Sequence, residues 1–148
     1  MPTETLSPAE ARDLKCLAGM IIPASTAYSV PGADDDLIMA DMLQSLGRDF
    51  ADVRTALANL ARLAGGSFAS LDPDRRGAVV GDFRAEGGQP LAILTRLVLL
   101  CYYRDDRVMR SLNLEPRPPF PKGHVVEQGD WSLLDQVRTR PRFWRDAP

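Results

Sequence analysis

Few residues of this chain have the types and spacing that catalysis requires. A nucleophilic mechanism needs a Ser, Cys or Thr beside a base, and the single histidine, His124, follows Lys122 and Gly123 in a segment without helical periodicity. Cys16 and Cys101 lie in apolar stretches, and neither belongs to a C-x-x-C pair. We therefore expect two buried thiols, no disulfide framework and no catalytic residue in this chain.

Two acidic runs are the remaining candidates for chemistry. Asp34, Asp35 and Asp36 are consecutive, and because successive helical side chains point about 100° apart, their carboxylates do not converge on one cation. Acidic residues are favoured where a helix begins, since the first N–H groups lack partners there. We interpret this run, and the pair Asp105 and Asp106, as helix caps, and we expect no metal site.

The composition excludes several classes of partner. A formal net charge of −2 without a Lys/Arg-rich block argues against nucleic acid. The longest apolar run, Leu97 to Cys101, is far shorter than the ~20 residues that span a bilayer, so no transmembrane helix is expected. The N-terminus shows no secretory or twin-arginine signal, which predicts a cytoplasmic protein. A periplasmic location is the alternative if a signal was removed or the partner directs export.

The elements that must position any site are predicted to be helices. Ser7-Pro8-Ala9-Glu10 is a capping box with proline at the first helical position, and Asp72-Pro73 is a second start signal. Glycine pairs end helices after residues 64 and 86, and the second and third helices are expected to be antiparallel. The predicted apolar faces are Leu14, Leu17, Ala18 and Ile21; Met39, Met42, Leu43 and Leu46; Val53, Ala56, Leu57, Leu60 and Ala64; Val79, Val80 and Phe83; and Val108, Met109 and Leu112.

One further segment is apolar on nearly all sides. Between Leu91 and Tyr103, only Thr95 and Arg96 interrupt the hydrophobic pattern. A helix that is hydrophobic all round normally lies in the centre of a bundle. We therefore predict a mostly α fold, a small bundle of about five to six helices over residues 1–114, with this segment as its core helix.

Residues 115–148 are predicted to form a long irregular arm, an extended segment rich in proline and aromatic residues that docks onto a partner. Four prolines open it, and it nevertheless contains both tryptophans of the protein, which solvated linkers generally lack. The last arginines recur mostly at every second position, which in an extended chain places several on one side. Two interpretations are equally open: solvated charge, or salt bridges to an acidic groove of a partner with Phe143 and Trp144 as anchors. A short strand over 124–127 requires an edge that a partner or a neighbouring segment supplies. The predicted partner-interface residues are Phe120, His124, Trp131, Arg138, Arg140, Arg142, Phe143 and Trp144.

Three stretches in their order resemble a known family. They are Ile21-Ile22-Pro23 with Val30-Pro31-Gly32-Ala33, then Leu71-Asp72-Pro73 with Arg75, then Cys101-Tyr102-Tyr103-Arg104-Asp105-Asp106-Arg107-Val108. Together they resemble the small subunit of membrane-associated gluconate 2-dehydrogenase, the subunit 3 or gamma family. The similarity covers about residues 14–114.

The resemblance implies a non-catalytic role beside a large catalytic subunit. Family members accompany a flavin-dependent dehydrogenase of the glucose-methanol-choline type, which carries the FAD and oxidises a sugar, polyol or related alcohol. The small subunit supports folding, FAD loading and, in many members, export through a twin-arginine signal. Here Arg75-Arg76 is internal, so it cannot be such a signal. We expect no cofactor in this chain, FAD in the partner, and an electron-transfer protein reached only through that partner.

Two other functions are compatible with the sequence. A free-standing helical adaptor would bind partners through the proline-rich start of the arm, 117–121. A small enzyme acting alone would require an activity or a tightly bound cofactor in the purified chain. The sequence does not identify the substrate of a partner dehydrogenase, because specificity belongs to the active site of that other polypeptide.

Overall fold

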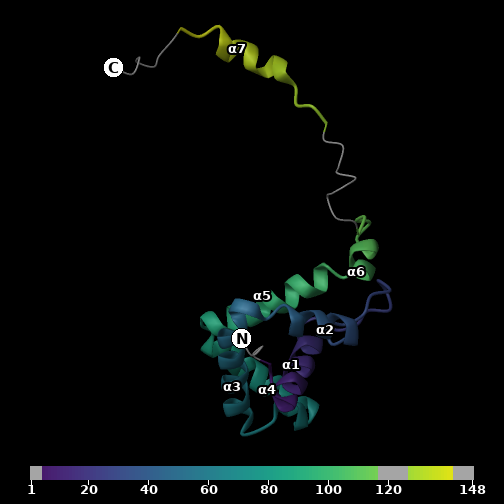
Figure 1. Cartoon of the computed structure of the whole chain (residues 1–148), viewed down its shortest axis with the longest axis vertical. Coiled ribbons are helices and arrows are strands. Elements are labelled where there is room, and N and C mark those ends of the chain that lie inside the picture. The colour runs from purple at the N-terminus through teal and green to yellow at the C-terminus, as the bar shows by residue number, and fades with distance from the viewer. Residues whose placement is uncertain (1–4, 117–126, 142–148) are drawn as a thin grey trace. The chain divides into compact units, whose positions relative to one another are not determined.

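The computed structural model describes residues 5–116 and 127–141 and is mostly helical (Figure 1). The chain divides into two compact units, Met1–Pro116 and Arg117–Pro148. Within the described residues, the only β pairing is an isolated antiparallel bridge between Ser25 and Val30. The predicted fold class, a small helical bundle, is confirmed.

Helix α1, Pro8–Ile21, begins as the sequence predicts. The Glu10 amide N donates to Ser7 Oγ at 3.2 Å, and the Ser7 amide N donates to Glu10 Oε2 at 2.8 Å, so the capping box is complete. The helix buries Leu14, Leu17 and Ala18, while Ile21 at its end is half-buried. A polar N-terminal cap and one apolar stripe therefore fix where this helix starts and which face it buries.

Helices α2 (Asp36–Gln44) and α3 (Phe50–Ala64) are separated by the 3₁₀ turn η1 (Gly47–Asp49). All five predicted core residues of α3 are buried, and Gly65 ends the helix with a φ of 70°, a conformation that favours glycine. In α2 the prediction for Leu43 is wrong, because this side chain is 41% exposed and Ile38 is buried instead. The other three predicted residues, Met39, Met42 and Leu46, are buried, so the predicted face is right except at its edge.

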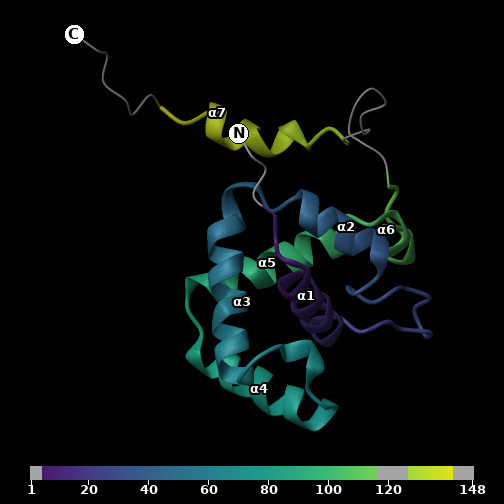
Figure 2. The ribbon, with the colours of Figure 1, turned by 60° about the horizontal axis from the view of Figure 1, so that its bottom comes forward.

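Helices α4 (Pro73–Glu86), α5 (Gln89–Tyr103) and α6 (Asp106–Ser111) complete the first unit, with a 3₁₀ turn η2 (Phe68–Ser70) before α4. Helix α5 packs against α3 and α2, and α3 also packs against α4 (Figure 2). The expected antiparallel pairing of the second and third helices is wrong, because α2 and α3 diverge in both views. In α6 only Val108 is buried, and Leu112, assigned to its apolar face, is 51% exposed.

The second unit contains two short helical segments, η3 (Trp131–Leu134) and α7 (Asp135–Arg138). Asp130 caps them, since its Oδ1 accepts from the Ser132 amide N at 3.0 Å. The expectation of an extended chain is therefore wrong for 131–138. A local cap and a helical turn satisfy the backbone hydrogen bonds of this segment without a partner strand.

Candidate functional site

One member of each acidic run, Asp35 and Asp105, caps a helix, as predicted. Asp35 Oδ1 accepts from the Leu37 amide N at 3.0 Å, and Asp105 Oδ1 accepts from the Arg107 amide N at 2.9 Å. Asp36 forms an ion pair with Lys15 at 2.5 Å. No group of three His, Cys, Asp or Glu residues in 5–116 and 127–141 could hold a metal ion. Capping by Asp35 and Asp105 is the interpretation made from the spacing, whereas the ion pair by which Asp36 joins α2 to α1 was not predicted.

The two cysteines are free and poorly suited to nucleophilic chemistry. Cys101 is buried, whereas Cys16 is only half-buried, so the expectation of two buried thiols holds for one of them. Burial raises the pKa of both thiols above the ordinary value. Because the thiolate is the reactive form, a raised pKa lowers the fraction available at neutral pH.

The first and third stretches of the family resemblance meet in space. The loop between α1 and α2 folds back so that the Ala33 amide N donates to Ile22 O at 2.8 Å. Tyr102 Oη, from α5, donates to Pro31 O of the same loop at 3.2 Å. Residues far apart in the sequence thus form one structural unit where α1, α2 and α5 come together.

Arginines strengthen this junction. Arg107 donates to both Asp35 carboxylate oxygens, at 2.7 and 3.1 Å, and also to Asp105. The guanidinium holds the pKa of both carboxyls below the usual range. Arg104 donates to both oxygens of Asp41, each at 2.6 Å, which ties the end of α5 to α2. The quoted motif residues therefore hold the loop and α2 against α5, and three of them, Cys101, Arg104 and Asp105, also line a small hollow of about 290 Å³.

The prediction that α5 is buried all round is wrong, and the error locates the candidate site. Leu94, Leu97, Val98, Cys101 and Tyr102 form the buried face of α5. On its other side Leu99 is 39%, Leu100 58% and Tyr103 53% exposed. Three large apolar side chains on one exposed helix face are typical of a surface that another molecule covers.

This exposed face of α5 lines a hollow of about 870 Å³. At one end of the hollow lie Gly87 and Gly88, and at the other end lie Tyr103 and Arg104. We call this feature the α5 groove. Its remaining lining residues are Leu91, Ala92, Thr95, Arg96, Leu99 and Leu100.

A second hollow, of about 440 Å³, adjoins the α5 groove. Leu91 and Thr95 line both hollows, so the two surfaces are continuous. The second hollow extends the apolar surface to α1 and α4. Its lining includes Met20 of α1, which is 40% exposed, and Phe83 of α4, which is buried. Together the hollows give the first unit one broad apolar face that spans three helices.

The arm supplies a separate set of exposed apolar groups. Trp131 is 62%, Leu133 74% and Val137 50% exposed. Arg138 forms an ion pair with Asp135 at 3.4 Å within α7, and the Arg140 amide N donates to Val137 O at 3.2 Å. The predicted interface residues Phe120, His124, Arg142, Phe143 and Trp144, and the conceivable strand over 124–127 except for its last residue, lie outside the described residues.

Sequence reasoning missed the α5 groove although a signal for it was present. Arg96 lies three, four and seven residues before Leu99, Leu100 and Tyr103, so all four share one helix face. Arginine is rarely fully buried, and its place in the otherwise apolar segment marks the exposed side. Apolar density alone indicated a core helix, whereas the position of one charged residue identified the solvent face.

Comparison with known proteins adds no relative. No family model matches the chain, and neither the curated proteins nor the solved structures contain a match. Among the described residues, no helix is long and apolar enough to cross a membrane. The resemblance to the gluconate 2-dehydrogenase small subunits therefore depends on the quoted motifs alone.

Proposed function

We propose that this chain is a non-catalytic accessory subunit that binds a larger protein through the α5 groove and the arm. The observation that carries the proposal is the exposed apolar face of α5, where Leu99, Leu100 and Tyr103 lie together on an otherwise well-packed helix. Burial of such a face on a partner stabilises the complex, since transfer of apolar surface from water is favourable by roughly 25 cal/mol per Å².

The identity of the partner comes from the sequence resemblance. The motifs that resemble the small subunits of gluconate 2-dehydrogenase imply a large FAD-dependent subunit of the glucose-methanol-choline type. In this proposal the FAD and the active site belong to the large subunit. The small subunit supports folding of the large subunit, its FAD loading and its stability by covering an apolar surface of the catalytic chain.

Co-expression with a large subunit tests the proposal. The full chain, a variant truncated after residue 114, and Leu100→Glu are each expressed with a candidate glucose-methanol-choline dehydrogenase from the same organism. Of these three forms, we expect only the full chain to give a high yield of soluble, flavin-loaded complex with the large subunit. Flavin absorbance measures that yield. Leu37→Glu is the matched control, because Leu37 is 68% exposed on α2 and lies outside both apolar hollows.

Three results would contradict the proposal. The maturation role is wrong if the large subunit folds, loads FAD and turns over equally well without this chain. If only truncation of the arm abolishes binding, and several unrelated partners bind the arm, a free-standing adaptor explains the protein better. A flavin or catalytic activity in the purified chain alone would instead indicate an enzyme.

A further inference from the structure

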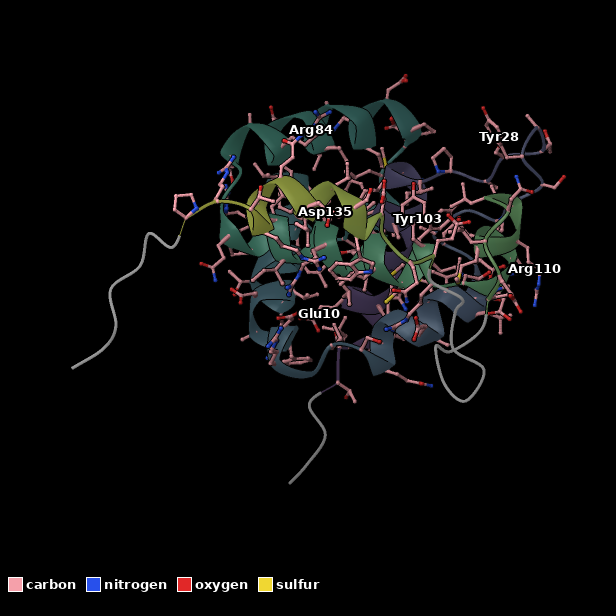
Figure 3. All side chains as sticks on the ribbon, turned by 90° about the horizontal axis from the view of Figure 1, so that it is seen from above. Glu10, Tyr28, Arg84, Tyr103, Arg110 and Asp135 are labelled. Carbon is pink, nitrogen blue, oxygen red and sulfur yellow. The ribbon has the colours of Figure 1, made fainter. Side chains whose placement is uncertain are left out.

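The charged residues that line the α5 groove and the adjoining hollow are all arginines. Arg96 and Arg104 line the groove itself, and Arg84 lines the adjoining hollow. Figure 3 labels Arg84 on α4 and Tyr103 on α5. Neither hollow has an Asp or Glu among the described residues that line it. A ligand for this surface must therefore present apolar groups beside neutral or negatively charged ones.

Two of these arginines are already paired within the chain. Arg96 Nη2 lies 2.5 Å from Asp49 Oδ2, and Arg104 is held by both carboxylate oxygens of Asp41. In the described part of the chain, no hydrogen bond or ion pair involves the side chain of Arg84, which is exposed. Arg84 is consequently the positive charge at this surface that is available to a partner.

The dimensions of the groove match a helix. Tyr103 follows Leu91 by twelve residues, which corresponds to about 18 Å along α5 at 1.5 Å per residue. Ala92 and the paired glycines Gly87 and Gly88 keep one end of the groove free of large side chains, which permits close approach of another backbone. Helices commonly bind such grooves through an apolar stripe with i, i+4, i+7 spacing.

We infer that the α5 groove receives an amphipathic helix of about three turns whose apolar stripe contacts Leu99, Leu100 and Tyr103 and whose acidic flank pairs with Arg84. Assignment of that helix to the large dehydrogenase subunit rests on the proposed function. The chemistry of the ligand, an acidic amphipathic helix, rests on the groove and its charges alone. The two can therefore fail separately.

A pair of synthetic peptides tests the ligand chemistry on the full chain. Each peptide has about 16 residues, with Leu at i, i+4, i+7 and i+11 and either Glu or Lys along one flank. Fluorescence anisotropy of labelled peptide measures the affinity of each. We expect the acidic peptide to bind about tenfold more tightly than the basic peptide at low ionic strength.

Charge reversal supplies the decisive comparison. Arg84→Glu is expected to weaken the acidic peptide about tenfold and to strengthen the basic one, and Leu100→Glu is expected to weaken both. Arg75→Glu is the matched control, since Arg75 is exposed on the same helix and nine residues away, which places it on the opposite side. Equal affinity for the two peptides, or equal effects of the two arginine substitutions, would overturn the inference.

Photo-crosslinking identifies the natural occupant in the assembled protein. A photoreactive amino acid replaces Leu100, and mass spectrometry maps the crosslinked residues in the complex with the large subunit. A crosslink to an acidic amphipathic helix of that subunit supports the inference. A crosslink to residues 131–138 of this chain, or to a second copy, overturns it. If no complex forms while the peptides still discriminate, the proposed function fails and the assigned ligand chemistry stands.

Discussion

Tyr102 Oη donates a hydrogen bond to the carbonyl oxygen of Pro31 at 3.2 Å, which links α5 to a loop 71 residues earlier. The Tyr102 ring is buried, and burial raises the pKa of its hydroxyl, so the group remains a neutral donor at physiological pH. The next residue, Tyr103, points its ring into solvent and into the α5 groove. Of these two adjacent tyrosines, Tyr102 therefore holds the bundle together, and Tyr103 forms part of the candidate docking surface.

Removal of each hydroxyl should separate these two roles. Tyr102→Phe leaves the Pro31 carbonyl without its partner, and we expect a loss of about 1 kcal/mol in the free energy of unfolding. Tyr103→Phe keeps the ring and is expected to change that free energy by less than about 0.5 kcal/mol. Urea denaturation followed by circular dichroism measures both values. A loss for Tyr102→Phe as small as that expected for Tyr103→Phe, below about 0.5 kcal/mol, would show that the Tyr102–Pro31 bond does not contribute measurably to stability.

The salt bridges of Arg107 should make stability depend on pH in the acidic range. Arg107 lowers the pKa of Asp35 and Asp105 in the folded chain. Both carboxylates therefore bind protons less readily in the folded state than in the unfolded state. The contribution of these two carboxylates to stability is fully present when the pH is above their unfolded-state pKa of about 3.8. It is lost as the pH falls through their lower folded-state pKa values.

Arg107→Gln tests this dependence. At neutral pH we expect a loss of about 1–2 kcal/mol, a modest figure because the Arg107 side chain is 38% exposed and solvent screens the pairs. Thermal unfolding measured from pH 7 down to about pH 2 should show a smaller acid-induced decrease for the variant than for the natural chain. Parallel curves would contradict the coupling. Arg110→Gln is the control, since it removes only an exposed pair within α6.

Glycine-to-alanine substitutions should have opposite effects at Gly32, where a Cβ atom would clash with the loop, and at Gly81, where the space is empty. A Cβ atom at Gly32 would lie 2.9 Å from the Ala24 backbone N, and it would also meet the Asp34 carboxylate. We expect Gly32→Ala to destabilise the protein by about 1–3 kcal/mol. Gly81 lies inside α4 with open space around it, so Gly81→Ala should instead stabilise the chain by about 0.5–1 kcal/mol. Melting temperatures that shift in the same direction for both variants would contradict this account.

The sequence predicted local starts and stops better than it predicted which faces meet. Ser7, Asp72 and Gly65 act through neighbours three or four residues away, so their effects can be read from a short window. The burial of Ile38 in place of Leu43, and the exposure of Leu100, depend on which helices lie beside α2 and α5. Those neighbours are set by long-range packing, which single-sequence periodicity does not encode.

The same limit applies to the candidate site. Composition predicts the arm, because tryptophans beside prolines are unusual in a solvated segment. The sequence did not predict the α5 groove. A run rich in Leu and Val is expected both for a helix buried in its own bundle and for a helix covered by another protein. Only the position of Arg96 separated the two cases, and its meaning depends on knowing that its partner Asp49 lies near the surface.

The two faces of α5 should respond in opposite ways to substitution. Leu97 is buried, so Leu97→Ala removes packed methyl groups and is expected to cost about 2–5 kcal/mol in the free energy of unfolding. Leu100 is 58% exposed, so Leu100→Ala should change that free energy by less than about 0.5 kcal/mol. If the α5 groove is a docking surface, Leu100→Ala should nevertheless lower affinity for the acidic peptide by about 1–2 kcal/mol, because the apolar area covered by the ligand decreases.

Measurement of unfolding and of peptide binding on the same two variants therefore separates a core residue from a contact residue three positions away. A stable Leu100→Ala variant with unchanged binding would mean that this exposed leucine is incidental surface. A destabilised Leu100→Ala variant would mean that the side chain packs within the bundle, and the apolar face of α5 would then no longer be available to a partner.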